Sequence, residues 1–128
     1  MNVLKSLSAL LTYPSRELQE AIPEIERILD ACGNIPDGAR VQLRLLTNSI
    51  ANGDLYELQE RYTDLFDRTR SLSLHIFEHI HGESRDRGQA MVDLQNHYAQ
   101  HGMEMGTREL PDFIPLFLEF LSLLPPTE

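Results

Sequence analysis

Residues 73–91, SLHIFEHIHGESRDRGQAM, decide how the middle of this chain folds. The first half predicts a helix that Ser71 or Ser73 can cap and that Gly82 ends. Ser84 can then cap a second helix, whose apolar positions recur at steps of three and four residues. The stretch therefore predicts two helices joined by a sharp break.

Helical periodicity continues on both sides of this stretch. Apolar residues repeat at helical spacing, and capping residues, glycine and proline mark the starts and stops. The predicted helices cover about residues 3–11, 15–32, 37–51, 54–66, 71–81, 84–101 and 111–124. No alternating pattern typical of strands competes with them. The sequence predicts an all-α fold, a single domain over 1–128 built as a bundle of about six to seven helices.

Some of these helices carry more specific expectations. Pro23 lies inside the second helix, so a kink or a split is expected there. The third helix is expected to bury Val41, Leu45, Leu46 and Ile50. The last helix is apolar nearly all round, which places it at the centre of the core or at a subunit contact, such as a homodimer.

Composition limits the classes of partner. The formal net charge of −9 over 128 residues repels nucleic acid and anionic membranes, whereas a basic peptide is a better electrostatic match. The single cysteine, Cys32, cannot form an internal disulfide, which suits a reducing cytosol. The N-terminus lacks the pattern of an export signal, and no apolar run reaches the ~18–20 residues that span a bilayer. We expect a soluble, cytoplasmic protein.

One motif suggests an enzyme. Residues 75–79, HIFEH, fit the pattern H-x-x-E-H, in which two histidines on a helix share a zinc ion and the glutamate serves as general base. This short pattern supplies no third ligand. The alternative is that His75 and His79 make ordinary hydrogen bonds or line a polar groove. A zinc-dependent hydrolase is kept as one alternative, and a purely structural dimerisation domain as another.

An aromatic stripe offers a binding hypothesis. The stripe recurs at helical spacing, which by default is typical of a core; its residues are Tyr62, Phe66 and Phe77, with Phe113, Phe117 and Phe120. If part of the stripe faces a groove, nearby carboxylates would rim it, and a helical peptide with apolar and basic residues would fit there. These carboxylates are Asp64, Asp67 and Glu78.

Two segments carry a resemblance to a known family. Residues 62–94, YTDLFDRTRSLSLHIFEHIHGESRDRGQAMVDL, and 109–125, ELPDFIPLFLEFLSLLP, resemble the NarJ/NarW chaperones of respiratory nitrate reductase, within the TorD/DmsD group of redox-enzyme maturation proteins. The resemblance implies an all-helical, TorD-like, non-catalytic protein. Such proteins bind the N-terminal leader-like segment of a molybdoenzyme's catalytic subunit and hold it while molybdenum cofactor is inserted. The resemblance also implies that this chain corresponds to the N-terminal and central part of such a chaperone and lacks the family's C-terminal helices.

The resemblance also implies site residues. The family signature Y-x-x-L-F falls on Tyr62, Leu65 and Phe66, and the signature E-x-P-D falls on Glu109, Pro111 and Asp112. Relatives commonly follow that aspartate with histidine, whereas this chain has Phe113. The predicted peptide-binding residues are Tyr62, Asp64, Leu65, Phe66, Asp67, Glu78, His79, Glu83, Arg85, Asp86, Glu109, Pro111 and Asp112.

Together these features predict a cytoplasmic assembly chaperone for the catalytic subunit of a nitrate reductase. Tyr62 and Phe66 would shape the apolar floor of the site. Charge complementarity would come from four carboxylates, Asp67, Glu78, Glu83 and Asp86. No catalytic residue, metal or cofactor is expected in this interpretation.

Overall fold

The computed structural model describes residues 2–68, 70–80, 85–103 and 110–125 of the chain. Its elements in chain order are α1 (Val3–Leu10), α2 (Arg16–Ala31), α3 (Asp37–Asn52), α4 (Leu55–Tyr62), a π-helix η1 (Thr63–Asp67), a 3-10 helix η2 (Arg70–Leu72), α5 (Ile76–Ile80), α6 (Arg85–Gln100) and α7 (Ile114–Ser122). Within these ranges the only β pairing is an isolated bridge between His75 and Phe113. The predicted all-α fold is confirmed. Gly82 and Ser84, the predicted break and cap, lie outside the described residues.

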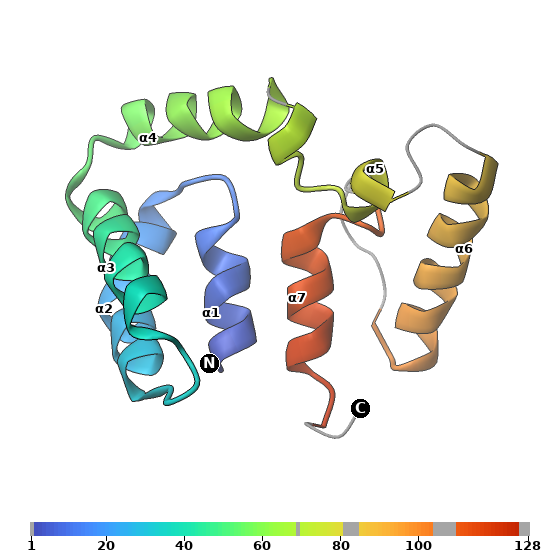
Figure 1. Cartoon of the computed structure of the whole chain (residues 1–128), viewed down its shortest axis with the longest axis horizontal. Helices are drawn as coiled ribbons and strands as arrows, with labels where there is room; N and C mark the ends of the chain where they lie inside the picture. Colours follow the sequence, from blue (N-terminus) through green and yellow to red (C-terminus); the bar gives the residue numbers. More distant parts are fainter. Residues whose placement is uncertain (1, 69, 81–84, 104–109, 126–128) are drawn as a thin grey trace.

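The helices are arranged around α1 and α7, which run side by side in opposite directions at the centre of the molecule (Figure 1). On one side α2 packs on α1 and α3 packs on α2. On the other side of α7 stands α6, and α4 crosses one end of the bundle (Figure 1). No helix in the described ranges has the length and apolar character needed to cross a membrane.

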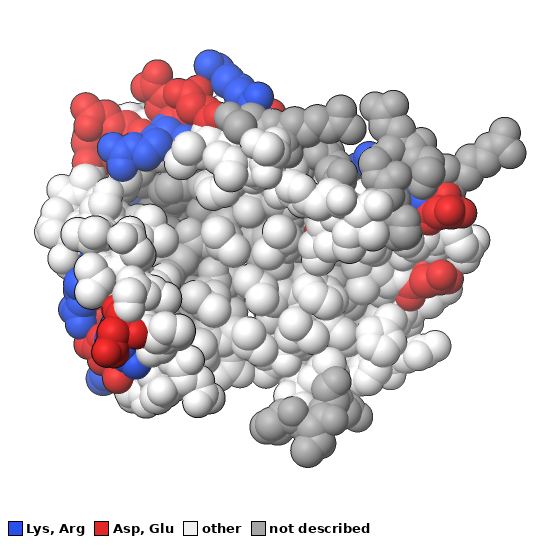
Figure 2. Space-filling view, in the orientation of Figure 1, with Lys and Arg blue, Asp and Glu red and all other residues white. Residues whose placement is uncertain are grey.

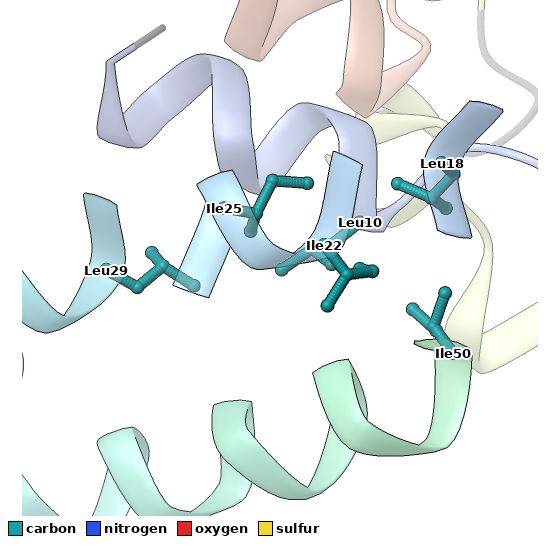
Figure 3. Close-up of a cluster of buried hydrophobic side chains, with 6 residues drawn as sticks. All are labelled: Leu10, Leu18, Ile22, Ile25, Leu29 and Ile50. Carbon is teal, nitrogen blue, oxygen red and sulfur yellow. The ribbon is translucent and has the colours of Figure 1, made fainter. Parts of the chain in front are cut away.

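The main core lies between α1, α2 and α3. Its buried side chains come from these three helices and point into the space between them (Figure 3); they are Leu10, Leu18, Ile22, Ile25, Leu29 and Ile50. The helix α2 continues through Pro23, so the predicted split is wrong. Pro23 is exposed, whereas Ile22 before it and Ile25 after it are fully buried in the core. Proline removes one backbone hydrogen bond, and the packing of these two isoleucines keeps the helix continuous despite that loss.

The contact between α1 and α7 rests on small side chains. Ser6 and Ser8 of α1 are buried, and the Ser8 hydroxyl donates a hydrogen bond to the Pro115 carbonyl oxygen at 2.6 Å. Small residues let two helix backbones approach closely, and each hydroxyl finds an acceptor. Ser8 therefore links α1 directly to the first turn of α7.

The outward side of α3 differs from expectation. Ile50 is buried as predicted, but Val41 is 60%, Leu45 is 59% and Leu46 is 42% exposed, so the prediction that they are buried is wrong. The physical reason is that α3 packs on α2 through the side that carries Thr47 and Ile50. Val41 and Leu45 lie on the opposite side of α3, whereas Leu46 lies closer to Ile50 and lines a hollow beside α4.

Two of the predicted helix starts lie further along the chain. The helix α5 begins at Ile76, and α7 begins at Ile114 instead of Pro111. The two segments that precede these helices pair with each other through their backbones. The Ile76 N–H donates to the Asp112 carbonyl oxygen at 3.0 Å, and the Ile114 N–H donates to the Leu74 carbonyl oxygen at 2.6 Å. Because this pairing keeps both segments extended, α5 and α7 each begin a few residues later in the chain than predicted.

Candidate functional site

The site begins at the junction of α4 and η1. Asp54 caps α4 by accepting a hydrogen bond from the Glu57 N–H at 3.1 Å, and the helix passes directly into the π-helical turn. Such turns are rare and frequently occur at functional sites, because the added residue redirects the side chains that follow. Here the turn directs Leu65 and Phe66, the second half of the Y-x-x-L-F signature. Leu65 is 42% exposed.

Tyr62 is held in place by contacts at both ends of its side chain. Its hydroxyl donates a hydrogen bond to the Leu11 carbonyl oxygen at 2.8 Å. Its ring meets Phe66 edge-on at a centroid distance of 4.9 Å and Tyr13 at 5.6 Å. Because a tyrosine ring combines an apolar body with a polar tip, these contacts fix both ends of the side chain. Tyr62 therefore ties the end of α4 to the end of α1.

On one side of Tyr62 lies an apolar hollow of about 130 Å³. Its lining comes from α1, α3, α4 and η1, and includes Leu46, Leu58, Leu65 and Phe66. Arg61 is its only charged lining residue among those described. The hollow could accommodate an apolar side chain of a bound molecule.

On the other side of Tyr62 lies a polar hollow of about 320 Å³, lined by Thr12, Tyr13, Tyr62, Asp67, His75 and Phe113. Thr12 and Tyr62 line both hollows. Asp67 is exposed, and no ion pair of its carboxylate is found in the described part of the chain. This carboxylate can therefore attract a cation that enters the polar hollow.

Asp112, next to Phe113 in the chain, is fully buried. One carboxylate oxygen accepts a hydrogen bond from Nδ1 of His75 at 3.2 Å, and the other accepts from the Phe77 N–H at 3.0 Å. The carboxylate accepts only, so the His75 ring must carry a proton on Nδ1. Asp112 thus orients the His75 ring at the edge of the polar hollow and holds the start of α5 against the start of α7.

Tyr98 supports the same region from α6. Its buried hydroxyl donates to the Pro111 carbonyl oxygen at 2.7 Å, and its ring packs on Phe120 at a centroid distance of 4.7 Å. Burial raises the pKa of the Tyr98 hydroxyl far above its ordinary value, and the Asp112 carboxylate adds to the effect. The hydroxyl therefore stays protonated and keeps Pro111 in place.

The geometry of HIFEH gives no support to a shared zinc ion. His75 precedes α5, and its Nδ1 is used by Asp112. Nε2 of His79 lies 2.8 Å from the Ser73 carbonyl oxygen. Among the residues whose positions are described, no group of three or more histidine, cysteine or acidic residues could hold a metal ion. The two histidines make ordinary hydrogen bonds, and His75 lines a polar hollow.

The structure brings together part of the predicted site. Tyr62, Leu65 and Phe66 line the apolar hollow, and Tyr62 and Asp67 line the polar one. Other predicted residues line neither hollow. Asp64 pairs with Arg68 at 3.0 Å on the surface, and His79 and Asp86 are exposed. Pro111 and Asp112 are buried. Glu83 and Glu109 lie outside the described residues, as do the side chains of Glu78 and Arg85.

Sequence reasoning missed four residues of the polar hollow as site residues: Thr12, Tyr13, His75 and Phe113. Tyr13 could have been noticed as an aromatic residue directly before a proline, at the end of a predicted helix. His75 was considered only as a metal ligand or a groove residue. Phe113 is predicted as a member of the aromatic stripe and is the position where relatives commonly have histidine, but the sequence does not place it among the binding residues.

Comparison with known proteins gives the sequence relationship. The chain is 45% identical over 122 residues to the nitrate reductase molybdenum cofactor assembly chaperone NarJ of Escherichia coli K12, which covers 95% of this chain and 52% of that protein. It is 43% identical over 125 residues to NarW of the same organism, named as a probable chaperone of the same kind, covering 98% of this chain and 51% of that protein. The chain spans about half the length of these relatives. Their names are those of assembly chaperones, which agrees with the prediction that this chain is not an enzyme.

A solved structure supports the fold. A crystal structure from Archaeoglobus fulgidus, assigned as a redox enzyme maturation protein, matches with a TM-score of 0.66 at 22% identity, covering 94% of this chain and 68% of that one. The two proteins share their helical fold. Residues 14–128 match the family described as nitrate reductase delta subunit. This chain, which resembles NarJ and NarW, therefore belongs to the nitrate reductase delta subunit family.

Proposed function

We propose that this chain is a cytoplasmic assembly chaperone of a nitrate reductase. In this role it binds the N-terminal segment of the apo catalytic (alpha) subunit and holds that subunit for molybdenum cofactor insertion and assembly before membrane attachment. It is not part of the final enzyme. Its membership in the nitrate reductase delta subunit family and the names of its E. coli relatives support this proposal.

The structural observation that carries the binding part is the position of Tyr62 between two hollows of opposite character. A peptide lying across Tyr62 would place an apolar side chain in the apolar hollow and a basic side chain beside Asp67. The overall charge of −9 favours the approach of such a peptide from a distance. The proposed client segment is therefore one in which basic and apolar residues are neighbours.

The two contacts would contribute differently to binding. Burying one apolar side chain stabilises a complex by about 1.5–3 kcal/mol. A cation beside an exposed carboxylate contributes at most about 1 kcal/mol, because water and salt screen the pair. The apolar hollow would thus supply most of the affinity, while Asp67 would set the orientation and speed the association.

Within this proposal Asp112 positions the site and does not contact the client. Its carboxylate is fully buried, and both oxygens already accept hydrogen bonds from His75 and Phe77. Direct contacts from the other charged residues stay predictions; these are Asp64, Glu78, His79, Glu83, Arg85, Asp86 and Glu109.

Isothermal titration calorimetry tests the proposal with a synthetic peptide that has the N-terminal sequence of the reductase catalytic subunit, and with a scrambled version. Asp67→Asn should weaken binding a few-fold and reduce its dependence on salt. Leu65→Ser should weaken it by about tenfold, corresponding to about 1.4 kcal/mol of lost apolar contact.

Matched controls come from exposed residues that line neither hollow. Asp93→Asn on α6 makes the same change in charge, and Leu123→Ser after α7 makes the same change in polarity. Both should bind the peptide as the unmodified chain does. Equal binding of the scrambled peptide, or unchanged affinity in both Asp67→Asn and Leu65→Ser, would refute the proposed site.

A further inference from the structure

The side chains that line the polar hollow offer hydrogen-bond acceptors and few donors. The hydroxyl groups of Thr12 and Tyr62 already donate their hydrogens to backbone carbonyl oxygens near the end of α1, at 2.6 and 2.8 Å. An ionised carboxylate such as that of Asp67 has no hydrogen to donate. Tyr13 adds one hydroxyl, which can rotate to donate or to accept. A molecule that enters this hollow therefore finds mainly acceptors.

The fixed tautomer of His75 adds one more acceptor. Nδ1 of its ring donates to the Asp112 carboxylate at 3.2 Å. In a neutral imidazole the other nitrogen then carries a lone pair, so Nε2 of His75 accepts. Asp112 is fully buried, whereas 27% of the His75 side chain is exposed, so Nδ1 points inward and Nε2 is the nitrogen left for the polar hollow. Asp112 therefore makes His75 an acceptor for a bound molecule.

Acidic charge is available at this end of the molecule. Figure 2 shows the Lys, Arg, Asp and Glu side chains at the edges of the view, some of them over α4, and a broad middle that is nearly free of them. Asp67 follows α4 through η1. Its neighbour Arg68 is paired with Asp64 at 3.0 Å, which leaves the Asp67 carboxylate without an ion pair within the described residues. A cation is therefore attracted to the polar hollow and not to the uncharged middle.

Three classes of ligand fit this set of acceptors less well than a guanidinium group. An anion needs donors, which the polar hollow mostly lacks. A metal ion needs three or more protein ligands, and no such group of histidine, cysteine or acidic side chains is found in the ranges that the structure describes. A lysine ammonium carries three donors at one strongly hydrated point, whereas a guanidinium spreads five donors over a plane that also stacks on aromatic rings. The rings of Tyr13, Tyr62 and Phe113 line the hollow, so a guanidinium matches both the acceptors and the rings.

We propose that the polar hollow is an arginine pocket. In it the Asp67 carboxylate and Nε2 of His75 accept hydrogen bonds from one guanidinium group, while the aromatic rings lie against its plane. His75 is then the residue that sets the preference for arginine over lysine, and Asp112 is the positioning residue that fixes its tautomer. This inference rests on the proposed function for the source of the arginine, which is a residue of the client's N-terminal segment.

Nuclear magnetic resonance of the full chain, labelled with ¹⁵N at its histidine rings, tests the proposal with two small probes of equal charge, N-acetyl-arginine methylamide and N-acetyl-lysine methylamide. In the free chain the His75 ring should carry its hydrogen on Nδ1 and none on Nε2. The arginine probe should shift the Nε2 signal until the site is saturated. The lysine probe should bind about three- to tenfold more weakly, because it makes one or two fewer hydrogen bonds.

Substitutions then assign the preference to one atom. His75→Asn keeps an NH₂ group that can donate to Asp112 but lacks Nε2, so it should reduce the preference for the arginine probe to less than about twofold. The matched control is His101→Asn, the same change at an exposed histidine after α6, which should keep the full preference. Asp67→Asn should weaken both probes, because both carry the positive charge that this carboxylate attracts.

Three results with the unmodified chain overturn the proposal: a hydrogen on Nε2 of His75 in the free chain, equal binding of the two probes, or saturation by neither. Titration with the N-terminal peptide of the reductase catalytic subunit separates this proposal from the proposed function. If that peptide binds and the Nε2 signal does not move, the arginine pocket is refuted and the chaperone function stands. If the arginine probe binds selectively and the peptide does not bind, the pocket stands and the proposed client is refuted.

Discussion

Asparagine in place of Asp112 should weaken the link between the starts of α5 and α7. The buried carboxylate accepts hydrogen bonds from His75 and from the Phe77 N–H, one on each oxygen. Asparagine keeps the size but has one oxygen and one NH₂ group, so one of the two donors then faces another donor. The loss of a charge-assisted hydrogen bond beside an unpaired buried donor costs about 2–3 kcal/mol. For a chain of this length the unfolding temperature should fall by about 6–12 °C.

Thermal unfolding followed by circular dichroism measures this effect. Glu119→Gln, which neutralises an exposed carboxylate on α7, should change stability by less than about 0.5 kcal/mol. Amide hydrogen exchange adds a local reading, because the Phe77 N–H should lose protection more than the amides of α2 do. An unfolding temperature of Asp112→Asn within about 2 °C of the unmodified chain would show that the carboxylate does not hold these segments together.

Two further substitutions test the surrounding packing. The raised pKa of Tyr98 means that the folded chain keeps this proton at a pH where the unfolded chain loses it, so stability should fall as pH rises above about 10. Tyr98→Phe should lower the free energy of unfolding by about 1–2 kcal/mol at neutral pH, because the Pro111 carbonyl oxygen loses its donor. The variant should also lose less stability than the unmodified chain at alkaline pH. Midpoints of urea unfolding between pH 7 and 11 check both effects. Ser8→Val should cost about 1–3 kcal/mol by crowding α7 and removing the bond to Pro115, whereas Ser71→Val at an exposed position should be nearly neutral in the same urea measurement.

Local chemistry explains why most helices could be predicted. Ser15 and Asp54 cap α2 and α4 through their side chains, as their residue types and positions indicated. The stripe of Leu18, Ile22 and Ile25 is buried because its spacing matches one face of a helix. The continuity of α2 through Pro23 could not be predicted, since the packing that holds the helix comes from other parts of the chain.

The sequence predicted the residues of the apolar hollow better than those of the polar hollow. The Y-x-x-L-F signature placed Tyr62, Leu65 and Phe66, which do line the apolar hollow. The polar hollow joins residues from the end of α1, from η1 and from the segments before α5 and α7, and no periodicity relates positions so far apart. Asp112 is among the predicted peptide-binding residues, and only the fold shows that its side chain is fully buried.

The sequence by itself determined the all-helical fold, most helix positions, the acidic charge and the family resemblance, because these follow from short-range spacing and from motifs that can be read along the chain. Tertiary structure decided which apolar stripes are covered. It left Val41 and Leu45 exposed because α3 packs on α2 through its other side, and it placed Tyr62 between two hollows because its hydroxyl is bonded to the end of α1. Both outcomes depend on contacts between distant segments, which helical periodicity does not encode.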